Sequence, residues 1–189
     1  WAIPGTPGLE HRIGGLEKAD KTGDISYDPA NHEFMVRTRA ARIEAIEVPD
    51  VDVEDADENA RVLVLGWGST YGPIGAGVRR VRKAGYQVAQ VHLRHLNPFP
   101  RDLGEILARY DKVLVPEMNL GQLAMLIRAR YLVDAVGYNH VRGLPLKAAE
   151  LAEAIGNLVA EAEGVEVHLT GAAHSADDHV DATTGGDRS

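Results

Sequence analysis

The sequence predicts an α/β fold with a mostly parallel, open sheet and helices on both faces. Short, almost continuous apolar runs such as RVLVLG (61–66) and DKVLVPE (111–117) alternate with segments that have helical periodicity. Strands that are buried on both faces have this composition, whereas half-exposed strands alternate apolar and polar residues. Parallel strands need crossover connections, and helical crossovers cover both faces of the sheet. A chain of 189 residues is long enough for one such domain with additional segments.

Residues 1–60 are predicted to be a connecting segment with one helix and an acidic linker. The first 30 residues are rich in Gly, Pro, Asp and Lys without periodicity, which predicts irregular structure. A helix is expected from Asn31, the predicted N-cap, with apolar positions such as Phe34 and Ile43. The stretch EVPDVDVEDADENA (47–60) is acidic and contains a proline, so we expect a solvated linker there.

Residues 61–163 are predicted to form the α/β domain itself, and residues 164–189 a disordered acidic tail. Pro73 is acceptable in the first turn of a helix, and Gly85 is a typical helix stop. The tail consists of small and acidic residues with little to bury. The predicted strands are 61–66, 86–93, 111–117 and 134–141, and the predicted helices are 73–84, 101–110, 120–132 and 146–162.

Composition excludes several kinds of partner and site. The net charge of −8 argues against nucleic acid, because phosphate binding needs a concentrated basic surface. No apolar run approaches the roughly 18 to 20 residues of a membrane-spanning helix. The chain has no cysteine, so it cannot ligate an iron–sulfur cluster through thiolates. His92 and His95 have no third ligand in reach by spacing, so we expect no metal site at this pair.

A glycine-rich turn, LGWGSTYGPIG (65–75), is the first candidate binding element. Tyr71 stands where the dinucleotide fingerprint needs its third glycine, and the next strand ends in VHLRHL without an acidic residue, which argues against NAD. Gly68, Ser69 and Thr70 would still present N–H groups and hydroxyls suited to an anionic group. A tight turn alone explains these residues about as well.

A second candidate element, EMNLGQL (117–123), follows a buried strand and precedes a helix. Open parallel sheets bind ligands and partner surfaces at the carboxyl ends of their strands. The candidate contacts with a ligand or a partner are therefore Glu117, Asn119, Gly121 and Gln122. A carboxylate and an amide are costly to bury unpaired. The structural alternative is that Asn119 caps the following helix and that Glu117 pairs with a nearby basic residue.

Taken together, these stretches resemble the alpha subunit of the 2-oxoacid:ferredoxin oxidoreductases, particularly the 2-oxoglutarate type. The resemblance covers about residues 1–160. It implies that residues 61–163 are a transketolase C-terminal-like domain in the C-terminal part of that subunit, with the pyrimidine-binding domain upstream of Trp1. It rests, in order, on PGTPGLEHRIGGLEKADKTGDISYDPANHEFMVRTRAARI, LGWGSTYGPI, VHLRHLNPFP and VPEMNLGQLAMLIRARY.

The same resemblance implies a function. The enzyme would decarboxylate 2-oxoglutarate oxidatively with coenzyme A, giving succinyl-CoA, carbon dioxide and reduced ferredoxin, with thiamine diphosphate supplying the carbanion chemistry. Thiamine diphosphate, magnesium and an iron–sulfur cluster would belong to the holoenzyme, and we expect none bound by this chain alone. This piece would help to assemble the enzyme and to position its parts. It would carry out no catalytic step and would be inactive by itself.

The implied partners are the beta subunit and, through the complex, ferredoxin. We expect a dimer of heterodimers in the cytoplasm, with no nucleic acid and no membrane. We assign no catalytic residue. The candidate coenzyme A or interface contacts are Gly68, Ser69, Thr70, Glu117, Asn119, Gly121 and Gln122.

The alternative is an independent α/β domain that binds a nucleotide or coenzyme A. Such a domain would grip a phosphate through the N–H groups of the Gly66–Gly72 turn. The irregular first 30 residues favour the oxidoreductase, because a self-contained domain has no need of them.

Overall fold

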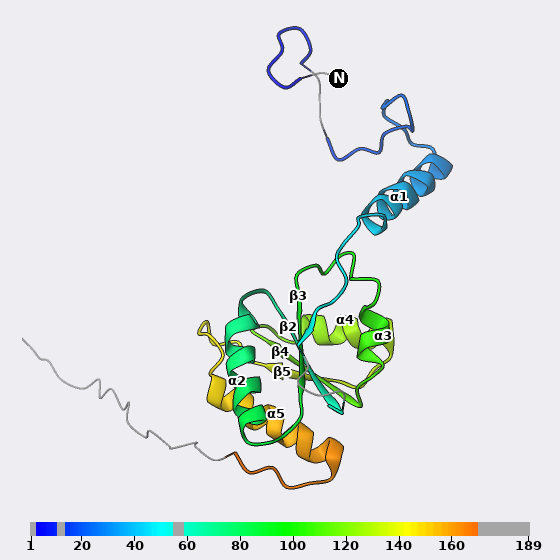
Figure 1. Ribbon diagram of the computed structural model, residues 1–189. Helices are drawn as coiled ribbons and strands as arrows, with labels where there is room; N and C mark the ends of the chain where they lie inside the picture. Colours follow the sequence, from blue (N-terminus) through cyan, green and yellow to red (C-terminus); the bar gives the residue numbers. More distant parts are fainter. Residues whose placement is uncertain (1–2, 11–13, 55–58, 170–189) are drawn as a thin grey trace, which may run out of the picture. The chain divides into compact units, whose positions relative to one another are not determined.

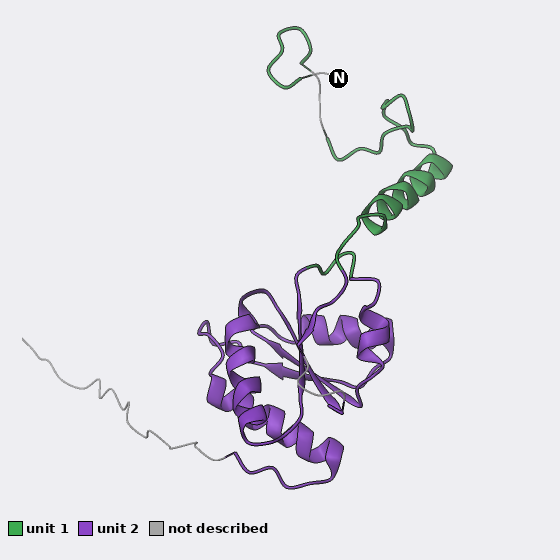
Figure 2. Ribbon diagram, viewed as in Figure 1, with its two compact units in different colours: residues 1–49, 95–99 green, residues 50–94, 100–189 purple. Residues whose placement is uncertain are grey.

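The computed structural model describes residues 3–10, 14–54 and 59–169 (Figure 1). The chain divides into two compact units, one formed by the residues up to Pro49 together with His95–Phe99, the other by Asp50–Arg94 and the residues from Pro100 on (Figure 2). The first unit contains one helix and the second contains the sheet. Within the described residues, every helix is too short or too polar to cross a lipid bilayer.

The helix of the first unit is α1 (Pro29–Glu44), and it begins earlier than the sequence predicts. The carboxylate of Asp28 accepts a hydrogen bond from the N–H of Ala30 at 3.1 Å, so Asp28 is the N-cap and Pro29 occupies the first helical position. The prediction of Asn31 as N-cap was wrong. Its side chain instead accepts from the N–H of Asp20 and donates to the carbonyl of Lys18, each at 3.0 Å.

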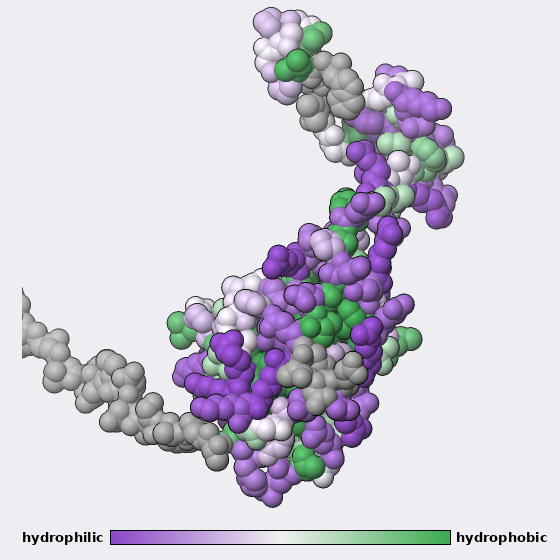
Figure 3. Space-filling model, in the orientation of Figure 1, coloured by the Kyte–Doolittle hydropathy of each residue, from purple (hydrophilic) through white to green (hydrophobic). Residues whose placement is uncertain are grey.

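The apolar positions of α1 do not form a core. Within the described chain none of its 16 residues is buried, and Phe34 and Val36 are 50% and 46% exposed. Figure 3 shows apolar and hydrophilic residues side by side on this unit. The helix is therefore held by its cap and by local pairs such as Arg37 with Glu33 rather than by packing.

Glu17 ties the irregular segment to α1. Its carboxylate accepts hydrogen bonds from Arg39 at 3.2 and 3.3 Å, and it lies 2.7 Å from Nδ1 of His32. The bonds from Arg39 and then His32 lower the pKa of Glu17 from 4.5 to about 2. Because the folded pKa lies below the ordinary value, the contact stabilises the unit above pH 4.5 and is lost as the pH falls towards 2.

We expect the side-chain carboxyl carbon of Glu17 to titrate near pH 2 in an NMR titration. Arg39→Ala should move this midpoint back towards 4.5, because it removes the largest cause of the shift. A Glu17 midpoint that stays in the ordinary range in the unaltered chain would show that the contact does not form.

The second unit is built on a five-stranded sheet with the order β1-β3-β2-β4-β5. Strands β3, β2, β4 and β5 are parallel, and β1 runs antiparallel to β3 at one edge. This arrangement confirms the predicted mostly parallel sheet. The strands are β1 (Val53–Glu54), β2 (Val62–Trp67), β3 (Ala89–Leu93), β4 (Lys112–Glu117) and β5 (Ala135–Asn139).

Strand β1 is a correction to the sequence analysis, which expected only a solvated acidic linker over residues 47–60. Val53 pairs with Val91, and the preceding backbone is held by Asp102, whose carboxylate accepts from the N–H of Val51 at 2.9 and 3.2 Å. Apolar and acidic residues alternate in VDVE, as expected for an edge strand with one exposed face. The strand was not predicted because the surrounding segment is rich in charged residues.

Two helices cover each face of the sheet (Figure 1). On one side lie α2 (Tyr71–Lys83) and α5 (Ala148–Glu163), and on the other α3 (Leu103–Leu107) and α4 (Gln122–Tyr131). The predicted helices exist, but their ends differ. A 3-10 turn over Gly68–Thr70 leads directly into α2, and α3 is shorter than the predicted 101–110.

Helices α2 and α5 approach each other closely at Gly77. A Cβ atom on Gly77 would lie 3.1 Å from the Cβ of Leu151 and 3.4 Å from the backbone nitrogen of Ala152. Both Val78 and Leu151 belong to the buried cluster between these helices and the sheet. The small residue therefore sets the distance between the two helices.

Residues 164–169, predicted to be the start of the disordered tail, contact the rest of the domain instead. Gly164 ends α5 in a left-handed conformation with φ 67°. Val167 and Leu169 then pack beside Gly156, and the N–H of His168 donates to the Tyr86 hydroxyl at 3.0 Å. The remainder of the predicted tail, 170–189, lies outside the described residues.

Leu132 ends α4 in a left-handed conformation, with φ 55° and 88% of its surface exposed. This conformation costs a non-glycine residue about 1 to 2 kcal/mol. Leu132→Gly is therefore expected to raise the free energy of unfolding by about 1 kcal/mol, measured by urea denaturation. Leu132→Ala keeps the strained backbone and is the control, so equal gains from both variants would contradict the explanation.

Candidate functional site

The two candidate elements meet at the centre of the sheet's carboxyl edge. From β2 the chain crosses to β3 on one side, and from β3 it returns to β4 on the other side of β2. The ends of β2 and β4 therefore flank the point at which the strand order reverses, where open α/β sheets bind their ligands. The turn after Trp67 and the loop after Glu117 both lie there.

The turn after β2 is closed by Thr70. Its hydroxyl donates to the carbonyl of Trp67 at 2.8 Å and accepts from the N–H of the same residue at 3.2 Å. Thr70 is only 4% exposed, so its hydroxyl serves the turn. Gly68, with φ 58°, and Ser69 are exposed.

Glu117 is the most deeply buried polar residue of the site, with an exposure of 0%. Its Oε1 accepts hydrogen bonds from the N–H of Leu123 at 2.9 Å and from the indole N–H of Trp67 at 3.3 Å. Its Oε2 accepts from the N–H of Ala124 at 3.0 Å. The carboxylate thus lies at the amino end of α4, where free N–H groups and the helix dipole favour a negative charge.

This geometry decides between the two interpretations of Glu117. The prediction that Glu117 pairs with a basic residue is wrong. Among the described residues, its carboxylate accepts hydrogen bonds from two backbone N–H groups, the Trp67 indole and the amide of Asn119. Glu117 joins the ends of two strands to the start of a helix. In the described structure the carboxylate is used internally and is 0% exposed.

Asn119 is not the N-cap of α4, which is Gly121, but its side chain bonds the backbone just before the helix and at its first residue. Its Oδ1 accepts from the N–H of Gly121 at 2.8 Å and of Gln122 at 3.0 Å, and its Nδ2 donates to Glu117 at 3.0 Å. Gly121 adopts φ 93°, which delays the start of α4 to Gln122. A Cβ on Gly121 would also lie 3.1 Å from the amide of Asn139.

Of the seven candidate residues, Gly68, Ser69 and Gln122 are exposed, while Thr70 and Glu117 are buried. The two elements approach each other at Ser69, whose hydroxyl lies 4.0 Å from the sulfur of Met118. The accessible part of the edge is thus a glycine turn, a hydroxyl and an amide. Such groups can dock a polar ligand or a protein surface.

A neighbouring cluster at the ends of β1 and β3 was not anticipated. The Tyr71 hydroxyl donates to the Glu54 carboxylate at 3.0 Å, which raises the pKa of Tyr71. The Tyr71 ring also lies edge-on to His92, with the centroids 5.0 Å apart. Burial, aided by Arg94, lowers the pKa of His92, so its ring is neutral at pH 7. The sequence feature that could have indicated this cluster is His92, which lies near the carboxyl end of a predicted strand.

Nδ1 of His92 is buried and has no hydrogen-bond partner among the described residues. Those residues also contain no group of three or more His, Asp or Glu side chains placed to hold a metal ion. His92 and His95 belong to different units. His92 is therefore a packed side chain at the edge of the turn.

Comparisons with known proteins give consistent results. Residues 60–144 match the family model described as pyruvate:ferredoxin oxidoreductase core domain II. The chain is 58% identical over 151 residues to the 2-oxoglutarate oxidoreductase subunit KorA of Mycobacterium tuberculosis, a match that covers 80% of this chain and 23% of that protein. It is 34% identical over 158 residues to the alpha subunit of 2-oxoacid:ferredoxin oxidoreductase 2 of Aeropyrum pernix, covering 80% of this chain and 24% of the relative.

A solved structure is also similar. The 2-oxoglutarate:ferredoxin oxidoreductase of Magnetococcus marinus, determined with 2-oxoglutarate, coenzyme A and succinyl-CoA bound, superposes with a TM-score of 0.69 and 32% identity. The match covers 84% of this chain and 28% of that one. The chain thus spans about a quarter of the length of the curated relatives described above, with 23% and 24% covered.

Proposed function

We propose that this chain belongs to the 2-oxoacid:ferredoxin oxidoreductases, because residues 60–144 match pyruvate:ferredoxin oxidoreductase core domain II, and from that premise we infer its role in the whole enzyme. It is part of the alpha subunit of a 2-oxoglutarate:ferredoxin oxidoreductase. That enzyme cleaves the bond between the carboxylate and the oxo carbon of 2-oxoglutarate, releases carbon dioxide and joins the remaining acyl group to coenzyme A. The electron pair of the cleaved bond goes to ferredoxin. The 58% identity to the KorA subunit carries this proposal.

The sequence does not fit an iron–sulfur cluster, and the described residues do not fit a magnesium site. The sequence contains no cysteine for an iron–sulfur cluster. The described residues offer no cluster of metal-binding side chains for magnesium. We therefore place thiamine diphosphate, magnesium and the iron–sulfur cluster in the rest of the enzyme and derive no step from this chain through them.

The role of this chain is to help assemble the enzyme and to position its parts. At its carboxyl edge Glu117 and Thr70 form internal hydrogen bonds, while Gly68, Ser69 and Gln122 are exposed. We propose that this edge contacts coenzyme A or the beta subunit in a dimer of heterodimers in the cytoplasm.

The direct test uses the full-length protein that carries this chain, purified with its partner subunit. We expect reduction of a low-potential dye that depends on both 2-oxoglutarate and coenzyme A. Loss of either subunit or of thiamine diphosphate should abolish it. Absence of reduction with every 2-oxoacid, together with saturable coenzyme A or nucleotide binding, would instead support an independent binding domain.

Ser69→Asp tests the edge itself. A carboxylate at this exposed position would repel the phosphates of coenzyme A, so we expect the KM for coenzyme A to rise about tenfold with an unchanged KM for 2-oxoglutarate. If the edge is a subunit interface, the subunits should instead separate more readily in sedimentation. The matched control is Ala149→Asp at an exposed position in the first turn of α5. Equal behaviour of both variants would contradict the assignment.

A further inference from the structure

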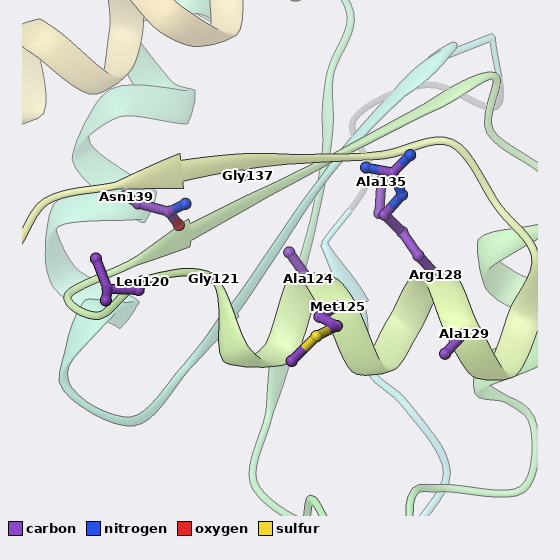
Figure 4. Close-up of a pocket in the computed structure, with 9 residues that line it drawn as sticks. All are labelled: Leu120, Gly121, Ala124, Met125, Arg128, Ala129, Ala135, Gly137 and Asn139. Atoms are coloured by element: carbon purple, nitrogen blue, oxygen red, sulfur yellow. The ribbon is translucent and has the colours of Figure 1, made fainter.

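A groove lies between α4 and the edge strand β5 (Figure 4), with a volume of about 560 Å³. Leu120 and Asn139 lie at one end, and the Arg128 side chain extends from α4 towards β5 near Ala135 at the other. The groove is separate from the turn at Gly68–Thr70, since none of the turn residues lines it.

Strand β5 gives the groove an open backbone edge. In the described sheet it pairs with β4 alone. The N–H of Val113 donates to the carbonyl of Asp134 at 3.0 Å, and the N–H of His140 donates to the carbonyl of Glu117 at 2.9 Å. Alternate residues of a strand direct their backbone groups to opposite sides, so Gly137 and Asn139 direct theirs away from β4. Such an edge can pair with a further strand.

The side chains along the groove have a definite chemistry. Leu120 and Met125 are 86% and 65% exposed and give the groove two apolar side chains. Arg128 forms no ion pair within the described residues. Gly137, which has no side chain, leaves the outer face of β5 open beside them.

We propose that this groove binds an extended segment of a partner polypeptide, which adds to β5 as a sixth strand. The segment places an acidic side chain on Arg128 and apolar side chains against Met125 and Leu120. Charge complementarity selects this occupant over a second copy of the chain, because β5 itself (Ala135–Asn139) carries no acidic side chain that could pair with Arg128. The inference goes beyond the proposed reaction and does not depend on it.

The test exploits the absence of cysteine from the chain, which lets a single introduced thiol carry a fluorescent label. The label is attached through Ala129→Cys, at an exposed position that lines the groove. The probe is a capped peptide in which every second residue, in the order valine, valine and glutamate, faces α4, with threonine at the positions between them. We expect a saturable fluorescence change, about tenfold weaker binding when lysine replaces glutamate, and no saturation when the pairing amides are N-methylated.

Matched variants locate the binding. Arg128→Glu should reverse the preference, so that the lysine peptide binds better than the glutamate peptide. Arg80→Glu makes the same charge change at an exposed position on α2 and should leave the preference intact. Equal binding of the N-methylated peptide to the labelled chain would overturn the proposal, whether or not Arg128→Glu folds. So would the absence of saturable binding, or a fluorescence change that depends on protein concentration without peptide, which would identify a second copy as the occupant.

Discussion

Replacing Glu117 by glutamine is expected to lower the free energy of unfolding by about 2 kcal/mol. Glutamine keeps one acceptor oxygen for Trp67 and Leu123 but presents an NH₂ group where Oε2 accepts from the N–H of Ala124. Two donors then face each other at a position with 0% exposure, and the N–H of Ala124 is left unpaired. Glu117→Ala removes every one of these bonds and leaves a cavity, so it should cost about 3 to 5 kcal/mol.

Urea denaturation monitored by circular dichroism measures both variants. The control is Glu161→Gln, because the Glu161 carboxylate is 62% exposed and pairs with Lys112 at the surface. It should change the free energy of unfolding by less than about 1 kcal/mol. If Glu117→Gln is as mild as this control, the carboxylate does not hold the start of α4.

The second large effect is expected at Gly77. Gly77→Val places a branched side chain where a Cβ alone would lie 3.1 Å from the Cβ of Leu151 and 3.5 Å from the carbonyl oxygen of Ala148. The backbone of α5 cannot yield as a flexible side chain can, so the two helices must separate. We expect a loss of about 3 kcal/mol in the free energy of unfolding.

Two further variants isolate the steric cause. Gly77→Ala should cost less than Gly77→Val, because the gain in helix propensity of about 1 kcal/mol offsets part of the crowding. Gly72→Ala, in the first turn of the same helix, has no atom within 4 Å of the added Cβ and should be neutral or stabilising. Equal losses for Gly72→Ala and Gly77→Val would indicate a general effect on α2 rather than the contact with α5.

The parts of the fold that depend on local sequence were predicted well. The central strands are apolar enough to be recognised without their neighbours, and the hydrogen bonds of Asn119 before α4 involve residues only two and three positions away. The N-cap of α1 was misplaced because both Asp28 and Asn31 are residues that cap helices, and only the contacts of Asn31 with Lys18 and Asp20 distinguish them.

The role of Glu117 could not be derived from local sequence. Its partner Trp67 lies 50 residues away on another strand, so the contact exists only once the sheet has formed. The groove beside β5 was missed for the same reason, since Arg128 and Gly137 come from different elements. The edge strand β1 was hidden by its acidic neighbours and is recognised only through its pairing with β3.

The strand order also has a consequence for synthesis on the ribosome. β2 lies between β3 and β4 in the sheet, yet both of these follow it in the chain. When Val62–Trp67 has emerged, neither neighbour has emerged, so this apolar strand has two unpaired edges until β3 is complete at Leu93 and one until β4 is complete at Glu117. Unpaired apolar strands are prone to associate with other chains. Slow translation between residues 67 and 117 should therefore increase aggregation more than an equal pause after residue 117.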